Sequence, residues 1–146
     1  LDGKAYVFTA KSGVGKTTHT KLWLEYFEGR ASYINGDKPI IRYKNGNWYA
    51  YGTPWMGKEK FGAPKCAPIQ SICFIERGEK NEIRNIDDKE VVDRLFHQLF
   101  LPQNPETLMR FMELVDRMVR ELPFFVLKCN ISFEAVEVAY EALKNA

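Results

Sequence analysis

The sequence has few of the residues that build metal cages or disulfide frameworks, and it has no long apolar run. Among 146 residues there are only 3 cysteines and 2 histidines. The cysteines, Cys66, Cys73 and Cys129, are odd in number and widely spaced, which argues against a zinc site and a disulfide scaffold. We therefore expect free thiols and a reducing, cytoplasmic location. No segment is apolar for long enough to cross a bilayer, and no secretory signal is present, so we expect no membrane association.

Neither sign of charge is in excess. Lys plus Arg number 21 and Asp plus Glu number 19, a net charge of +2, so nothing favours a nucleic-acid partner. With 45% hydrophobic and 14% aromatic residues, the chain can bury a core. No repeat or linker divides it, so we expect one domain over residues 1–146. Because the chain begins at Leu1 rather than Met, we expect it to be a piece of a longer polypeptide.

The most informative stretch present is residues 10–18, Ala-Lys-Ser-Gly-Val-Gly-Lys-Thr-Thr. The apolar segment Ala5 to Ala10 predicts a strand before it. Apolar pairs four residues apart predict a helix over Lys16 to Phe27, closed by Gly29. A glycine-rich turn between a strand and a helix lets backbone N–H groups converge on a phosphate at the helix N-terminus. We therefore predict a phosphate-binding loop.

Within this loop, Gly13 and Gly15 permit the turn, Lys16 neutralises β- and γ-phosphate charge, and the Thr17 hydroxyl ligates Mg²⁺. Ala10 stands where the pattern Gly-x4-Gly-Lys-Ser/Thr has its first glycine, which makes the loop a variant. One alternative is an ordinary glycine-rich turn with a chance lysine. A dinucleotide fingerprint is disfavoured because it wants Gly or Ala where Thr18 stands. The candidate nucleotide-binding residues are Ser12, Gly13, Val14, Gly15, Lys16, Thr17 and Thr18.

Asp37 is the candidate second magnesium ligand. Ser32 to Ile34 predicts a second strand, and a right-handed crossover would return it parallel to the first strand. The carboxyl ends of both strands would then share one edge of the sheet and place Asp37 near the phosphate loop. The alternative is an aspartate favoured at Asn35-Gly36-Asp37 only for its turn chemistry.

The rest of the chain predicts a mixed sheet with helices. Ile40 to Tyr43 and Trp48 to Tyr51 flank Asn45-Gly46, a hairpin signal. Strands are expected over Pro68 to Glu76, Glu82 to Ile86 and Phe124 to Lys128, the second pairing back on the first across Gly78. Helices are expected over Asp88 to Phe100, Pro105 to Glu121 with Asn104 as N-cap, and Ser132 to Lys144 with Ser132 as N-cap.

Phosphoryl transfer needs cations around the transferred group, and the long loop from Gly52 to Pro68 supplies candidates. Lys58, beside Gly57, is the foremost candidate, with Lys60 and Lys65 as others; a solvated basic loop is the alternative. His19 is interpreted as a packed helix residue rather than a nucleotide contact. Trp48, Trp55, Tyr49 and Tyr51 form either an aromatic platform for adenine or ordinary hairpin packing.

The run Ser12-Gly13-Val14-Gly15-Lys16-Thr17, followed closely by a strand and Gly36-Asp37, resembles the HPr kinase/phosphorylase family and the related phosphoenolpyruvate carboxykinases. The resemblance covers about the first third of the chain. It implies an α/β fold, a P-loop-containing mixed β-sheet with flanking helices, that binds ATP and Mg²⁺. Lys16 and Thr17 match the phosphate and metal positions, and Asp37 matches one of the family's paired aspartates. Lys38 or Gly36 stands where the other aspartate would be, which argues against phosphorylase activity.

The resemblance thus implies an ATP-dependent kinase, and we expect it to phosphorylate a hydroxyl of a protein, peptide or small molecule. The catalytic candidates are Lys16 and Asp37, which the resemblance supports, and Lys58, which is chosen as a cation of the long loop. Self-association is a reasonable expectation, both from this likeness and from exposed sheet edges. Two alternatives stay open. One is a nucleotide-binding regulatory module without turnover, and the other is a small-molecule or nucleotide kinase of the commoner loop class.

Overall fold

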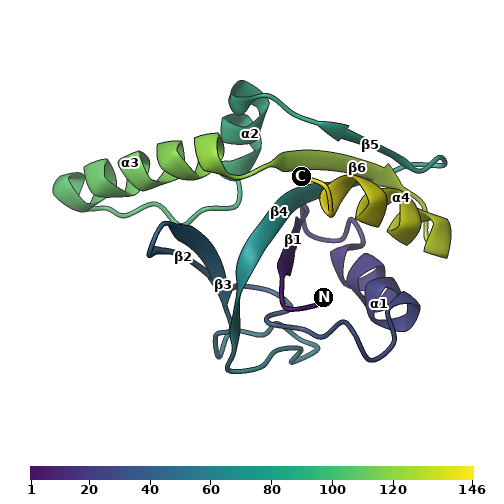
Figure 1. The fold of residues 1–146 in the computed structure, drawn as a ribbon. Helices are drawn as coiled ribbons and strands as arrows, with labels where there is room; N and C mark the ends of the chain where they lie inside the picture. Colours follow the sequence, from purple (N-terminus) through teal and green to yellow (C-terminus); the bar gives the residue numbers. More distant parts are fainter.

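A computed structural model describes all residues, 1–146. The chain forms a mixed β-sheet of six strands and four helices (Figure 1). In chain order the elements are β1 (Ala5–Thr9), α1 (Lys16–Tyr26), β2 (Ile40–Lys44), β3 (Asn47–Tyr51), β4 (Cys66–Arg77), β5 (Glu82–Asn85), α2 (Asp88–Leu95), α3 (Pro105–Glu121), β6 (Phe124–Cys129) and α4 (Phe133–Leu143).

Strand β4 organises the sheet because it is the longest strand and pairs with three others. It pairs in parallel with β1 and β6, and antiparallel with β3 of the β2–β3 hairpin. Strand β5 adds to β6 in antiparallel direction. Since β1, β4 and β6 run the same way, their carboxyl ends, at Thr9, Arg77 and Cys129, lie at one edge of the sheet.

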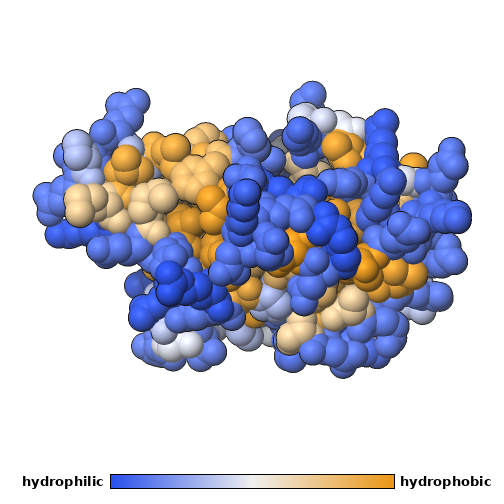
Figure 2. Space-filling view, turned by 90° about the horizontal axis from the view of Figure 1, so that it is seen from above, coloured by the Kyte–Doolittle hydropathy of each residue, from blue (hydrophilic) through white to orange (hydrophobic).

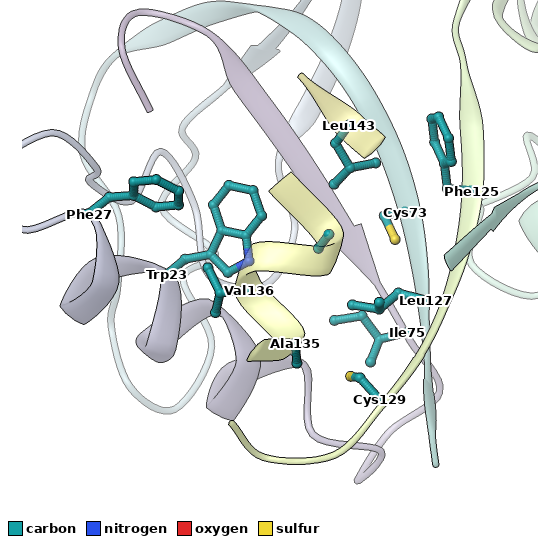
Figure 3. Packing of buried hydrophobic residues seen from close by; sticks show 11 residues of the cluster. Trp23, Phe27, Cys73, Ile75, Phe125, Leu127, Cys129, Ala135, Val136 and Leu143 are labelled. Carbon is teal, nitrogen blue, oxygen red and sulfur yellow. The ribbon is translucent and has the colours of Figure 1, made fainter. Parts of the chain in front are cut away.

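Alternate residues of β4 and β6 supply two cores, one on each face of the sheet. Cys73 and Leu127 belong to the core under α1 and α4, to which Trp23 of α1 and Val136 of α4 also contribute (Figure 3). The opposite face packs against α2 and α3, and the members of that cluster are Trp48, Ile72, Phe74, Val91, Leu95, Val115, Met118, Val119, Phe124 and Val126. A sheet buried on both faces explains why β4 and β6 are nearly continuous apolar runs.

Three helices begin at the side chains that satisfy their first amides. Asn104 accepts from the Thr107 N–H and Ser132 from the Ala135 N–H, which confirms both predicted N-caps. Asp87 caps α2 in the same way. Helix α1 differs, because its N-cap residue is Gly15 and no side chain caps it.

Three sequence predictions about elements were wrong. Ser32–Ile34 is not a strand beside β1, since its neighbours bond elsewhere: Gly36 N–H donates to Phe61 O (2.7 Å) and Ala63 N–H to Ile34 O (3.1 Å). Strand β5 pairs with β6 rather than with β4. Helix α2 ends at Leu95, short of the predicted Phe100.

The three cysteines are free, as expected, and burial raises the pKa of the Cys73 and Cys129 thiols. None of the helices combines the length and apolar character that a membrane span requires. Figure 2 shows an apolar patch over the α3 end of the molecule. The exposed apolar side chains of that region are Phe100, Leu101, Met109, Met112 and Leu114.

Candidate functional site

The glycine-rich loop (residues 10–15) joins β1 to α1 at the carboxyl edge of the parallel strands. Gly13 has φ 80° and Gly15 has φ 120°, values that side-chain-bearing residues rarely adopt. Val14 donates its N–H to Lys11 O (3.2 Å) and packs its side chain against the core, so its own amide is occupied. Five backbone N–H groups have no acceptor in the chain: those of Gly13, Gly15, Lys16, Thr17 and Thr18.

These free amides point out of an uncapped helix N-terminus, where the aligned peptide dipoles add partial positive charge. No acidic side chain of the first turn neutralises it. Ser12 and Thr18 are exposed and Thr17 is half-buried, with no hydrogen bond from any of their hydroxyls. The loop therefore has the donors and the charge that an anion such as a phosphate requires.

Lys16 connects this loop to the Asp37 turn. Its ammonium group donates to the carbonyl oxygen of Gly36 at 2.7 Å. Helix α1 is joined to the same segment by Thr20, whose Oγ1 lies 2.9 Å from the Tyr33 hydroxyl. Lys16 thus links the start of α1 to the Asp37 turn, although the parallel crossover predicted to place Asp37 near the glycine-rich loop does not exist.

The fit of a magnesium ion can be judged from the unpaired oxygen ligands. The Thr17 hydroxyl and the exposed Asp37 carboxylate make no hydrogen bond or ion pair within the chain. Mg²⁺ prefers oxygen ligands and usually takes one or two from protein and the rest from water and phosphate. No group of three or more His, Cys, Asp or Glu side chains could hold a metal ion alone. In donor chemistry, the Thr17 hydroxyl and the Asp37 carboxylate would suit a magnesium ion that also took phosphate oxygens.

Arg77, the last residue of β4, holds the glycine-rich loop from the neighbouring strand. Its Nε donates to Val14 O at 3.0 Å, and its Nη2 donates to Gly13 O. Because these carbonyls are drawn toward Arg77, the arginine fixes the orientation of the loop's peptide groups. Sequence reasoning missed this residue. The signal was its position directly after a predicted apolar strand, which became informative only once that strand was known to be parallel to β1.

The turn at Asp37 is held by two polar residues that sequence reasoning also missed. Asn35 Oδ1 accepts from the N–H groups of Asp37 (2.8 Å) and Lys38 (2.7 Å). Asn35 Nδ2 donates to Thr53 Oγ1 (3.0 Å) and Thr53 O (3.2 Å). Thr53 is buried and donates its hydroxyl to Lys38 O (2.8 Å).

The long loop (residues 52–65) lies against this turn, but its predicted catalytic lysine does not reach the site. Lys58 is exposed and makes no hydrogen bond or ion pair. Its neighbour Gly57 packs on Asp37, since a Cβ built on Gly57 would lie 3.1 Å from Asp37 Cβ. The loop is docked instead by Phe61, stacked on Tyr33 with ring centroids 4.6 Å apart.

His19 is a core residue, as interpreted from the sequence. It is 3% exposed and its Nε2 accepts from the Trp23 indole N–H at 2.9 Å. Burial lowers the pKa of His19 from 6.5 to about 4, so the ring is neutral near pH 7. Nδ1 has no partner. Trp48 is likewise buried, and its indole donates to Glu121, so it forms no adenine platform.

A cavity of about 270 Å³ runs along the unpaired edge of β1 and reaches Lys16 at the start of α1, but residues 10–15 of the glycine-rich loop do not line it. Lys16 and Asp37 line one part of it, and Arg30, Ser32 and Lys65 another. Its only carboxylates are Asp37 and Asp2, and Asp2 is paired with Arg30. The cavity therefore holds one unpaired carboxylate.

Comparison of the chain with protein-family models, with curated proteins and with solved structures gives no match. The function is therefore inferred from the residues and their arrangement alone.

Proposed function

We propose that the chain is a Mg-ATP-dependent phosphotransferase of P-loop type that transfers the γ-phosphate to a hydroxyl acceptor on a protein, peptide or small molecule. The observation that supports this most strongly is the set of unpaired amides, those of Gly13 and of Gly15 to Thr18, at the N-terminus of the helix that carries Lys16. The likeness of Ser12–Thr17 and Gly36-Asp37 to the HPr kinase/phosphorylase family supports the same conclusion.

In this proposal the residues of the chain bind and orient the phosphates. The amides of Gly13, Gly15 and Lys16 donate to phosphate oxygens, and Lys16 exchanges its bond to Gly36 O for one to a phosphate. Thr17 and Asp37 hold Mg²⁺, which neutralises the charge that develops on the phosphates. Lys58 is exposed on a loop whose Gly57 packs against Asp37, and in this proposal the loop moves to bring Lys58 to the phosphates.

One observation favours a second candidate, a nucleotide-binding regulatory module without turnover. A kinase commonly uses a carboxylate as base for the acceptor hydroxyl. The cavity offers only Asp37 for this role, because Asp2 is paired with Arg30. Lys38, which follows Asp37, is not a carboxylate, and its ammonium group lies over the Phe100 ring, 5.2 Å from the ring centroid. A single carboxylate that holds the metal is not free to act as base.

Isothermal titration with ATP and Mg²⁺ tests both candidates. We expect the wild-type chain to bind Mg-ATP and Lys16→Ala to bind at least about tenfold more weakly, since one charged contact is worth more than about 1.4 kcal/mol. Lys89→Ala, an exposed lysine on α2, is the matched control and should bind as the wild type does.

Turnover separates the two candidates. A kinase releases ADP when its acceptor is present, whereas a regulatory module binds ATP, changes conformation and releases none. Absence of any Mg-ATP binding by the wild-type chain would refute both.

A further inference from the structure

The Asp37 turn is cross-linked to the long loop by one closed set of hydrogen bonds. The side-chain amide of Asn35 accepts from two N–H groups of the turn and donates to both oxygens of Thr53. The Thr53 hydroxyl then donates to Lys38 O at 2.8 Å, which closes the set. All the hydrogen-bonding groups of the Asn35 side chain are used within the chain.

The Asp37 carboxylate makes no hydrogen bond or ion pair, so the direction of this side chain depends on the conformation of its backbone. The Asn35 Oδ1 bonds fix the peptide groups of Asp37 and Lys38, and Gly57 packs against the Asp37 side chain. Thr53 is 5% exposed, so a hydrogen bond lost there is not replaced by bulk water. The network thus joins the buried Thr53 to the backbone of the one residue whose carboxylate is assigned to the metal.

We propose that Asn35 and Thr53 are positioning residues that fix the backbone of the Asp37 turn and so hold the Asp37 carboxylate in place for magnesium. This inference depends on the proposed function, because it assumes that Asp37 holds Mg²⁺ beside bound ATP. Residues that orient a metal ligand commonly affect metal affinity by tenfold or more when replaced.

The test compares ATP binding with Mg²⁺ and with EDTA by isothermal titration. We expect Mg²⁺ to tighten ATP binding by the wild-type chain, and Asp37→Ala to remove this gain. Thr53→Val, which keeps the shape and loses the hydroxyl, should reduce the magnesium-dependent gain about tenfold. Thr53→Ser, which keeps the hydroxyl, should keep the magnesium-dependent gain of the wild-type chain. Metal-free ATP should bind all four proteins alike.

Asn35→Asp provides a second, independent variant. It keeps an oxygen to accept from the Asp37 and Lys38 amides, but it has no N–H to donate to Thr53. We expect it to lose the magnesium-dependent gain as Thr53→Val does, with circular dichroism confirming that both variants are folded.

Three outcomes overturn the inference in distinguishable ways. A full magnesium-dependent gain in Thr53→Val and Asn35→Asp would show that these residues do not position Asp37. An equal loss of metal-free ATP affinity would show that they support only the general structure. If the wild-type chain binds ATP under neither condition, the proposed function itself fails.

Discussion

At the scale of single residues, the glycine-rich loop depends on backbone angles that alanine does not adopt without strain. Gly15 has φ 120° with open space around its missing Cβ, so a substitution there is strained by its backbone angles alone. We expect Gly15→Ala to lower the free energy of unfolding by about 1–2 kcal/mol and to weaken Mg-ATP binding about tenfold. Denaturant titration and isothermal titration measure the two effects.

Gly29 is the matched control for this substitution. It has φ 74°, also with open space around it, but it lies beyond the opposite end of α1. Gly29→Ala should therefore lose similar stability and keep wild-type ATP affinity. Equal weakening of ATP binding by both variants would show that binding responds to general stability and not to the loop.

His19 makes a pH-dependent contribution to stability. Its pKa is about 4 in the folded chain against 6.5 when unperturbed, so the unfolded state takes up a proton first as the pH falls. The stability from the neutral ring is complete above about pH 6.5 and is lost as the pH falls toward 4. We expect a loss of about 2 kcal/mol between pH 7 and pH 5, measured by denaturant titration at each pH.

A comparison of the two histidines tests this expectation. His97 is exposed, so His97→Gln should keep the pH dependence, whereas His19→Gln should remove most of it. A wild-type stability that stays constant between pH 7 and pH 5 would contradict a neutral, buried His19.

At the scale of elements, local sequence signals predicted individual helices, caps and turns, but they did not predict which strands pair with each other. The caps Asn104 and Ser132, the β2–β3 hairpin and the strand–loop–helix unit around Gly13 and Gly15 follow from short-range chemistry, and all are present. Strand partners depend on contacts far apart in sequence. The neighbour of β1 is therefore β4, about 60 residues away and apolar from Ile72 to Ile75, instead of Ser32–Ile34.

In the candidate site, too, the residues with a local sequence signal were predicted and those that depend on long-range contacts were not. Lys16 and Asp37 were recognised by residue type and spacing, and the structure brings their segments together through Gly36. Arg77 and Thr53 were missed because their roles depend on the parallel pairing of β4 and on the path of the long loop. The position of Arg77 after an apolar strand has no meaning until the partner of that strand is known, and no local pattern marks Thr53.

The coupling between β4 and the glycine-rich loop can be measured through Arg77. Its two hydrogen bonds to loop carbonyls are exposed, so we expect Arg77→Ala to cost less than about 1 kcal/mol of stability but to weaken Mg-ATP binding about fivefold. Hydrogen exchange should show faster exchange of the Val14 amide, the one N–H group between Gly13 and Lys16 that has an acceptor, Lys11 O.

Arg84 offers a matched comparison, because it is also exposed and also makes two hydrogen bonds, to Glu90 at 2.8 and 2.7 Å. Arg84→Ala should leave loop exchange and ATP affinity unchanged. Unaltered loop exchange in Arg77→Ala would mean that the loop's conformation is fixed by its glycines alone.

At the scale of the whole molecule, one sheet shared by two cores should make unfolding a single event. Adjacent residues of β6 face opposite sides: Leu127 belongs to the core with α1 and α4, and Val126 to the core with α2 and α3. Both are almost fully buried. We expect Leu127→Ala to lower the free energy of unfolding by about 3 kcal/mol and Val126→Ala by about 2 kcal/mol.

The two cores contain different tryptophans, which allows each to be followed separately. Trp23 lies in the core under α1 and α4, and Trp48 in the opposite core, whereas Trp55 is 64% exposed. In variants that retain only Trp23 or only Trp48, Leu127→Ala should shift the fluorescence transition and the far-ultraviolet circular dichroism transition to the same denaturant concentration. The loss of packing on one face is transmitted to the other because both faces need the β4–β6 pairing. A Trp48 transition that stays in place while the Trp23 transition moves would show instead that the α2–α3 face unfolds independently, and that the glycine-rich loop can open while the rest of the sheet remains folded.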